Sequence, residues 1–457
     1  MFQHTRLFRY LCPLILALSL LIYVAMNHRS GTPTPAFAQT RVQPTPRGTP
    51  PLTRVTPVPK PSIPRVVTVP TPSPLPTPAG PVFNVTQMGS LSVKPNDPSD
   101  STDKLQAIIR QCPDGGTVYF PAGTYLITKS LDLTTACSML GEKGRSIIST
   151  QPVDQRRFFV FVTRKNMQGL SFQRLVFEGG GIFLESGPHR QVTIRENIFR
   201  DFPPAKSPSG RETTFFERVN VFCSLGLSEA EISDNIFENS PDSYGVEVWG
   251  PISHFKFNRN YCYNIRQCIH TASRIDTHYP RAEFNHNVGL KLSRMGIEIQ
   301  TLFDDAQIIG NYMADWRNIG QPENYACMAR YGYDCDTMGL SLAFGGFRAI
   351  ARDNIVLGPA SQFGNPTEGG TSFGIELYTA EGSITTNNFI VNMAPAIVTD
   401  HATGNYVVAG NYMCGSPYAT QIGWNARWQN NPTNVFSDTC ANAAWISLLP
   451  PPPRRPF

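Results

Sequence analysis

Acidic side chains are missing from the first 81 residues, which nevertheless carry eight lysines and arginines. All 34 aspartates and glutamates therefore lie in residues 82–457, and removing the eight cations from the formal net charge of +5 leaves −3 there. Proteins that bind nucleic acid usually present a strongly basic surface to the phosphates. We therefore expect no nucleic-acid partner for the folded part of the chain.

The apolar run near the start is too short for a comfortable membrane span. Leu11–Met26 has 16 residues against the roughly 20 needed, and it follows Arg6 and Arg9 in the order of an export signal. The small-residue site Ala36–Ala38 lies unusually far beyond it, which favours a retained anchor, although cleavage remains open. We expect residues 1–30 to be a signal peptide or an N-terminal membrane anchor, so that the protein is secreted or anchored at the outer face of the cell membrane.

Residues that could build a core are scarce in residues 31–81, where the sequence is almost wholly Pro, Thr, Ser, Val and Arg, as in PTPRGTPPLTRVTPVPKP. Such a composition cannot bury a core and favours an extended polyproline conformation. We predict a disordered linker over 31–81, a folded domain over 82–450 and a Pro-rich tail over 451–457. The folded part has about 370 residues, which is more than one ordinary globular core serves, so we expect two domains or a repeat architecture.

A second cysteine or histidine pair at zinc-site spacing is absent beside Cys262 and Cys268, so a metal site there is a weak interpretation. Ten cysteines, nine of them beyond the apolar run, instead suit disulfides in an oxidising compartment. Close spacings suggest four pairs and leave Cys223 over, while the connectivity stays open. The pairs are Cys112 with Cys137, Cys262 with Cys268, Cys327 with Cys335, and Cys414 with Cys440.

One short phrase, centred on an asparagine, recurs eight times in the folded part. The copies are VTIRENIF at Asn197, AEISDNIF at Asn235, FKFNRNYC at Asn260, AEFNHNVG at Asn287, AQIIGNYM at Asn311, AIARDNIV at Asn354, SITTNNFI at Asn388 and YVVAGNYM at Asn411. The intervals of 23 to 43 residues indicate a unit of about 24 that insertions stretch, as in a solenoid.

A second phrase precedes most copies, and both phrases have the two-residue period of a half-buried strand. The asparagine tolerates left-handed backbone angles and offers an amide donor and acceptor, so stacked copies should form a hydrogen-bonded ladder. Two or three short strands per turn predict an all-β, single-stranded right-handed parallel β-helix. The second phrases are GIFLE at Gly181, GVEVW at Gly245, CIHTA at Cys268, GIEIQ at Gly296, GLSLA at Gly339, GIELY at Gly374 and AIVTD at Ala396.

Both ends of this solenoid carry segments that could close it. Residues 102–111 place Leu105, Ile108 and Ile109 at helical spacing after a cap signal, which predicts a capping helix. At the other end, a repeat-free segment contains three tryptophans that we expect to pack as a cap. These are Trp424, Trp428 and Trp445. Closed ends prevent an open apolar rung from pairing with other chains, so we expect the folded domain to be monomeric.

The stretch STDKLQAIIRQCPDGGTVYFPAGTYLITKSLDL resembles the opening of the pectate-lyase-like right-handed parallel β-helix superfamily. With the asparagine turns, the resemblance covers roughly Phe83 to Met413. The resemblance implies the fold. It does not select an activity, because the superfamily includes lyases, glycoside hydrolases, epimerases and adhesins. Two family patterns are missing: Lys94–Ser99 replaces the usual Gly-Asp-Gly, and the polygalacturonase set is not in register, since Asp304-Asp305 falls in the turn after a strand.

Strand alternation predicts a row of polar side chains on the outside of the second phrase. If the second residue of each phrase points inward, Glu247, His270, Glu298 and Glu376 point outward, rung after rung. Two positions further on, the same face receives residues suited to binding sugar rings. These are Trp249, Gln300, Tyr378 and Asp400.

Three insertions lie beside this face, at 200–220, 312–338 and 358–373, and we expect them to wall a groove; Trp316 stands in the middle one. Two rungs separate Glu298 from Glu247, about 9.6 Å, near the upper end of the roughly 6.5–9.5 Å of inverting glycosidases. One glutamate would be held protonated as the acid while another activates water, and His270 would tune either.

Three functions remain open at this point. We favour a glycoside hydrolase that needs no cofactor and acts on a neutral polysaccharide, because an acidic row would repel a polyuronate. The second is a uronate lyase or epimerase, in which the acids hold Ca²⁺ and His270 or Arg274 removes the C5 proton. The row itself carries no Lys or Arg, which weakens this hypothesis. The third is a non-catalytic adhesin, and the Pro-rich linker favours this hypothesis.

Overall fold

The computed structural model describes the second of two compact units, Val58–Phe457, from residue 80 onward. The expected anchor and linker lie outside the described residues, and no helix within the described ranges is long and apolar enough to cross a membrane. The described ranges are 80–150, 159–202, 218–274, 277–316, 337–342, 346–358, 372–377, 382–393, 396–399, 407–415, 420–422, 433–437 and 439–456.

The predicted capping helix is confirmed as α2 (Thr102–Gln111). Leu105, Ile108 and Ile109 are fully buried on its inner face, which packs against β4 (Leu131–Leu133). Asp100 starts the helix by accepting the Thr102 amide at 2.9 Å. A short 3-10 turn, η1 (Gly89–Leu91), packs against the helix.

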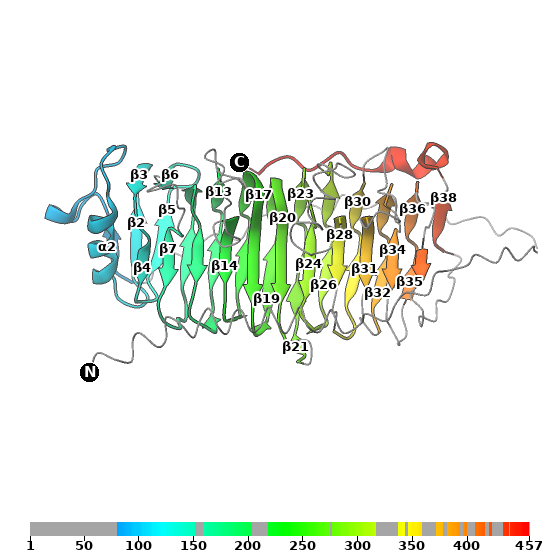
Figure 1. The fold of residues 1–457 in the computed structure, drawn as a ribbon, viewed down its shortest axis with the longest axis horizontal. Coiled ribbons are helices and arrows are strands. Elements are labelled where there is room, and N and C mark those ends of the chain that lie inside the picture. Colours follow the sequence, from blue (N-terminus) through cyan, green and yellow to red (C-terminus); the bar gives the residue numbers. More distant parts are fainter. Residues whose placement is uncertain are drawn as a thin grey trace, which may run out of the picture. The chain divides into compact units, whose positions relative to one another are not determined.

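The predicted parallel β-helix is confirmed, and the described strands form three faces that follow one another along the coil (Figure 1). The first face contains β1 (Val82–Asn84), β2 (Thr117–Phe120), β5 (Ser138–Gly141), β8 (Ser171–Gln173), β12 (Thr193–Arg195), β16 (Glu231–Ser233), β19 (Phe255–Asn258), β22 (Ala282–Glu283), β26 (Gln307–Ile309), β29 (Ile350–Arg352), β32 (Ile384–Thr386) and β35 (Val407–Ala409).

The second face contains β3 (Gly123–Ile127), β6 (Ser146–Thr150), β9 (Leu175–Glu178), β13 (Ile198–Arg200), β17 (Ile236–Trp249), β20 (Tyr261–Ala272), β23 (Val288–Leu290), β27 (Tyr312–Ala314), β30 (Ile355–Leu357), β33 (Phe389–Val391), β36 (Tyr412–Cys414) and β38 (Val435–Ser437). Strands β17 and β20 continue around the corner, so each also forms part of the third face.

The third face carries the second phrases of the repeat. Besides the C-terminal parts of β17 and β20, it contains β4, β7 (Phe161–Thr163), β10 (Ile182–Leu184), β14 (Val219–Cys223), β24 (Ile297–Gln300), β28 (Thr337–Leu342), β31 (Ser372–Leu377), β34 (Ile397–Thr399) and β37 (Thr420–Ile422). Short pairings at the remaining corner involve β11 (His189–Arg190), β15 (Leu227–Ser228), β18 (Ile252–Ser253), β21 (Tyr279–Pro280) and β25 (Phe303–Asp304).

The interior of the coil is filled by side chains that stack from rung to rung. Phe177, Phe199 and Phe237 stack with ring centroids 4.7 and 5.0 Å apart, and all three are fully buried. Each such side chain contributes about 1.5–3 kcal/mol relative to an exposed one. Burial of such side chains inside the coil therefore stabilises these three rungs.

The predicted asparagine ladder is confirmed and extends to a ninth member, Asn434. The side-chain amide of Asn287 donates to the carbonyl of Phe257 at 2.8 Å and to the side-chain oxygen of Asn311 at 3.0 Å. The left-handed residue is not the asparagine, as the sequence suggested, but the one before it, such as Glu196 at φ 56°. The ladder asparagine needs its side chain inside the turn, so its neighbour makes the sharp bend.

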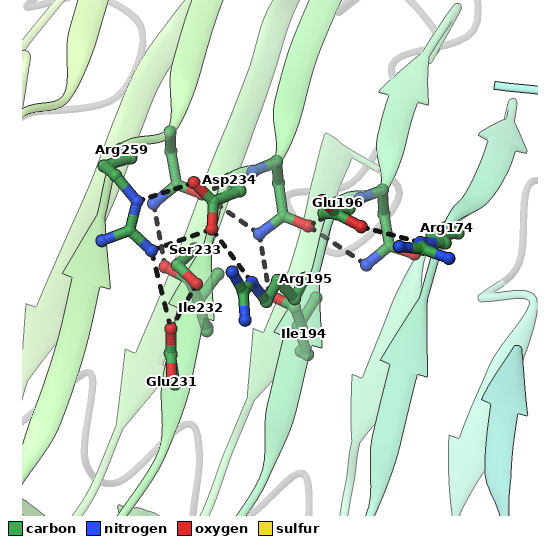
Figure 2. A network of polar contacts seen from close by, with 12 residues as sticks. Arg174, Ile194, Arg195, Glu196, Glu231, Ile232, Ser233, Asp234 and Arg259 are labelled. Atoms are coloured by element: carbon green, nitrogen blue, oxygen red, sulfur yellow. Dashed lines mark hydrogen bonds and ion pairs between the residues drawn. The ribbon is translucent and has the colours of Figure 1, made fainter. Parts of the chain in front are cut away.

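Ion pairs follow the same turns, because those left-handed residues are charged on several rungs (Figure 2). Asp234 accepts from Arg259 of the next rung at 2.7 and 2.8 Å and from Arg195 of the previous rung at 3.0 Å. Glu196 pairs with Arg174 at 2.8 Å. Opposite charges therefore meet between adjacent rungs, as where Arg195 and Arg259 both contact Asp234, and such pairs stabilise the stacking of the turns.

Three predicted disulfides are confirmed, and Cys223 is free and buried. The confirmed pairs are Cys112–Cys137, Cys262–Cys268 and Cys414–Cys440. The pair of Cys327 with Cys335 falls outside the described residues, as do Trp424 and Trp428. Trp445 is described and lies against the outside of the second face, in contact with Phe389 and Tyr412.

Candidate active site

The predicted row is in register on the third face. Glu247 of β17 pairs with His270 of β20, which pairs with Glu298 of β24. Beyond them, Ser341 of β28 and Glu376 of β31 continue the row. The residue before each carboxylate belongs to the core, as Val246 and Ile297 show. Alternation along the strand therefore places these polar side chains on the outside of the coil.

The row is less exposed than the sequence suggested. Glu247, Glu298 and Glu376 are 1%, 2% and 9% exposed. Neighbouring polar and aromatic side chains account for part of this cover, because Trp249 and Gln300 hydrogen-bond back onto the carboxylates. A carboxylate in such surroundings interacts more strongly with its neighbours than one in water.

Glu247 has one oxygen that accepts two hydrogen bonds and one that is buried without a partner in the described structure. Its Oε1 accepts from the indole N–H of Trp249 and from Nδ1 of His270, both at 2.5 Å. Its Oε2 is buried and has no hydrogen-bond partner in the described structure. Because an unpaired buried carboxylate oxygen is costly, this atom is a natural contact point for a substrate group or a water.

Glu298 accepts hydrogen bonds on both oxygens. Gln300 donates to Oε1 at 2.7 Å, while Gln267 and Arg294 donate to Oε2 at 2.8 and 3.1 Å. Burial alone would raise the pKa of Glu298, but the Arg294 guanidinium and the His270 imidazolium together with these donors hold the pKa below its usual value. Glu298 is therefore a carboxylate at neutral pH.

His270 lies between these two carboxylates. Burial would lower its pKa, but the charges of Glu247 and Glu298 raise the pKa to about 9. The ring is thus an imidazolium at neutral pH and donates from Nδ1 to Glu247. Its Nε2 is buried and, like Oε2 of Glu247, has no hydrogen-bond partner in the described structure.

Two site residues escaped the sequence analysis. Gln267 and Arg294 contact Glu298 from the segments that lead into β24 and the third-face part of β20. A signal for arginine existed, because RQCIH and RMGIE place Arg266 and Arg294 four residues before His270 and Glu298. The Arg294 amide donates to the Arg266 carbonyl at 3.0 Å, so these two positions are neighbours on adjacent rungs.

Comparison with known proteins agrees with the architecture. Residues 82–290 match the family model described as rhamnogalacturonase A/epimerase, pectate lyase-like. A tailspike protein mutant of E. coli bacteriophage HK620, solved with a pentasaccharide, is 13% identical at a TM-score of 0.51, over 78% of this chain and 67% of that one. The chain has the fold of the pectate-lyase-like β-helix superfamily.

Two further likenesses of this pectate-lyase-like β-helix were found, and no curated protein matches the sequence. The Agl-KA catalytic domain is 11% identical at a TM-score of 0.51, over 76% of this chain and 60% of that one. The A-module of the Azotobacter vinelandii mannuronan C-5 epimerase AlgE6 is 13% identical at a TM-score of 0.42, over 78% of this chain and 99% of that one. At 11% and 13% identity, the likenesses to the Agl-KA domain and the tailspike protein establish the fold alone.

The two tryptophans expected to bind sugar rings lie in different surroundings, Trp249 beside the carboxylates and Trp316 in the core. Trp249 is half-buried beside Glu247, and its ring meets that of Phe222 edge-on at 5.1 Å. Phe222 stacks on Phe183 of the rung before, also at 5.1 Å, so aromatic rings continue the row towards the N-terminus. Trp316 is only 7% exposed and packs in the main core, where it cannot stack on a sugar.

Other predicted features of the groove are not described. Tyr378 and Asp400 lie outside the described residues, and so do most of the insertions at 200–220, 312–338 and 358–373. Ser341 donates its hydroxyl proton to Glu376, two rungs from Glu298. The compact constellation therefore comprises Glu247, His270, Glu298 and the side chains that contact them.

The row does not suit a calcium ion, which takes roughly six to eight oxygen ligands. Both oxygens of Glu298 are already held by amide and guanidinium donors, and the protonated His270 separates Glu298 from Glu247. No group of three or more His, Cys, Asp or Glu within the described ranges is placed to hold a metal. We therefore derive no step through Ca²⁺.

Proposed function

We propose that this β-helix is a polysaccharide-active enzyme that hydrolyses glycosidic bonds on its third face. The observation that carries the proposal is that two side chains on neighbouring rungs have opposite protonation states. The pKa of Glu298 is lowered, and the pKa of His270 is raised to about 9. Such a pair supplies a base and an acid at the same pH. The name of the matching family model, which includes a rhamnogalacturonase, supports a polysaccharide substrate.

In this mechanism a water molecule attacks the anomeric carbon while Glu298 takes its proton. The leaving oxygen receives a proton from Nε2 of His270, and the C–O bond breaks. Glu247 holds Nδ1 of the ring and stabilises the imidazolium before transfer. This differs from the arrangement expected from sequence, in which a glutamate was the acid, because the lowered pKa keeps Glu298 deprotonated at neutral pH and leaves it no proton to donate.

The choice of a neutral sugar no longer follows from charge. Arg294 and the protonated His270 stand among Glu247 and Glu298, so the constellation is not a purely acidic surface. A uronate would not meet the repulsion that the sequence suggested. This observation favours a uronate lyase or epimerase as a second candidate, with a cation available to pair with the sugar carboxylate.

The deciding assay offers the purified protein a panel of neutral and uronate polysaccharides. Hydrolysis predicts new reducing ends without absorbance from a carbon–carbon double bond, and activity that survives a chelator. Absorbance from a double bond would show that the reaction is elimination rather than hydrolysis. Uptake of solvent deuterium at C5 without cleavage would indicate epimerisation. Binding without any reaction on the whole panel would overturn the enzymatic proposal in favour of an adhesin.

The proposed place of action is outside the cell. Export through residues 1–30, as secreted protein or membrane-anchored protein, would bring the third face to extracellular polysaccharide. The three disulfides of the described structure are stable in such an oxidising compartment. We also propose that the folded domain acts as a monomer.

A further inference from the structure

A second apolar cluster lies on the outside of the coil. On the second face, Val176 points away from the core, while its neighbours Leu175 and Phe177 belong to it. Strand after strand repeats this outward apolar residue. The column comprises Val176, Ile198, Ile236, Tyr261, Val288, Tyr312, Ile355, Phe389 and Tyr412. Every member is less than 10% exposed, and strands that are apolar on both sides are typical of a parallel sheet with both faces covered.

The C-terminal segment covers part of this column. The 3-10 turn η5 (Ala444–Leu448) places the ring of Trp445 5.7 Å from Phe389 and 5.8 Å from Tyr412. Leu449 packs against the same cluster. The disulfide between Cys414 and Cys440 of η4 (Cys440–Asn442) fixes the start of this segment to β36.

Beyond Leu449, the pattern of side-chain burial is typical of a polyproline helix that lies on a surface. Pro450, Pro453 and Pro456 are half-buried, whereas the residues between them are exposed. A burial period of three matches the three residues per turn of polyproline II. Figure 1 shows this terminal segment running along the coil from β38 back to β17.

An ion pair fixes the far end of the segment. Arg455 donates to Glu238 of β17 through Nε at 2.9 Å and through a terminal nitrogen at 2.8 Å. The Glu238 side chain is 9% exposed and that of Arg455 is 39% exposed. The six steps from Leu449 to Arg455 span about 19 Å as polyproline II, or about four rungs.

We propose that the outside of the second face is a recognition surface for an arginine-bearing polyproline segment, with residues 449–456 as its occupant in cis. This surface offers an apolar column that includes Tyr261 and Tyr312, and one buried carboxylate, Glu238, where the arginine of the segment docks. Aromatic-lined grooves bind polyproline helices at low entropic cost because the ligand is already extended. Glu238 selects the arginine through a paired contact that a lysine would not reproduce.

Docking in the intact chain can be followed by trypsin cleavage between Arg454 and Arg455. Cleavage should be slow in the wild-type protein and at least about tenfold faster in Glu238→Gln, because the segment loses its anchor. The matched control is Glu178→Gln, which removes an acid of the same face whose partner is Arg200. Equal cleavage in the wild-type protein and Glu238→Gln would show that the segment is not held.

Recognition itself can be measured with a labelled peptide, Leu-Pro-Pro-Pro-Pro-Arg-Arg-Pro, added to the full-length Arg455→Gln variant. We expect saturable binding by fluorescence anisotropy. Glutamine at the peptide position of Arg455 should weaken binding about tenfold, and glutamine at the position of the exposed Arg454 should not. Absence of binding, or equal loss from both peptide changes, would overturn the proposal even if the trypsin result held.

Discussion

At the scale of single residues, His270 is the group on which the proposed chemistry depends. It lies between two carboxylates, and their charges raise its pKa to about 9 against the opposing effect of burial. Its Nε2 has no partner in the described structure. If a substrate oxygen reaches Nε2, the proton held there can be transferred to it.

The substitution Glu247→Gln should lower the pKa of His270, because it removes the carboxylate that stabilises the imidazolium. The wild-type ring stays protonated below about pH 9, so activity should fall as the pH rises through that value. Nitrogen NMR of the imidazole measures both states directly. An unchanged pKa in Glu247→Gln would contradict the assignment, and Glu283→Gln on the first face is the control.

A second histidine should make folding sensitive to acid. His189 is fully buried, and burial lowers its pKa to about 4 from 6.5. The unfolded chain therefore binds a proton before the folded one does, and about 3 kcal/mol of stability should be lost as the pH falls from about 6.5 to about 4.

Denaturant unfolding of wild-type protein and His189→Gln at pH 7 and pH 4 tests this. Glutamine can still accept the Met167 amide and donate to Thr163, as His189 contacts both, but it cannot take up a proton. The variant should lose about 3 kcal/mol less than the wild-type protein between the two pH values. The same loss in both proteins would exclude His189 as the source.

At the scale of the elements, each rung is held by its asparagine as well as by its strands. Asn287 receives hydrogen bonds from the backbone and side chain of Asn260, and it donates to Phe257 and Asn311. All of these groups are buried. Removing one asparagine therefore leaves several buried polar groups without partners.

Asn287→Ala should destabilise the domain by about 2–4 kcal/mol, measured as the free energy of unfolding. The comparison is Asn285→Ala, because the half-buried side chain of Asn285 accepts only one backbone amide, that of Ile309. Asn285→Ala should cost clearly less. Equal costs would mean that the ladder adds nothing beyond ordinary turn formation.

The sequence predicted the elements because each rung repeats the same local requirements. Alternation in GVEVW, CIHTA and GIEIQ was enough to align Glu247, His270 and Glu298. The repeated position of Arg266 and Arg294 was a signal in the sequence, but the contacts of Arg294 and Gln267 with Glu298 depend on how the chain turns the corner between the second and third faces. Alternation could not show the burial of the row, which arises from side chains two and four positions away.

At the scale of the whole molecule, strands β17 and β20 connect the two outer surfaces described above. Strand β17 carries Glu238 of the proposed polyproline-binding surface and Glu247 of the candidate active site, while β20 carries Tyr261 and His270. No sequence pattern predicted the contact between the C-terminal segment and β17, because residues 449–456 and Glu238 are more than 200 positions apart. Only the closed turns of the coil bring them together.

The front cap should be needed to keep the coil from associating with other copies. Ile108→Asp places a charge on the fully buried face of α2 and should free the first rung, so light scattering should show self-association. Arg110→Asp changes an exposed position of the same helix and should leave the particle size unchanged. If Ile108→Asp stayed the size of the wild-type protein, the helix would not serve as a cap.

The most direct test of the proposed hydrolysis compares kcat of the wild-type protein with that of Glu298→Gln on the polysaccharide that the panel identifies. Circular dichroism and the unfolding temperature establish that the variant is folded, and Glu283→Gln is the matched control. The account predicts a loss of about 10²- to 10⁴-fold in Glu298→Gln, because the base is removed, and no loss in the control. Full activity in Glu298→Gln would contradict it.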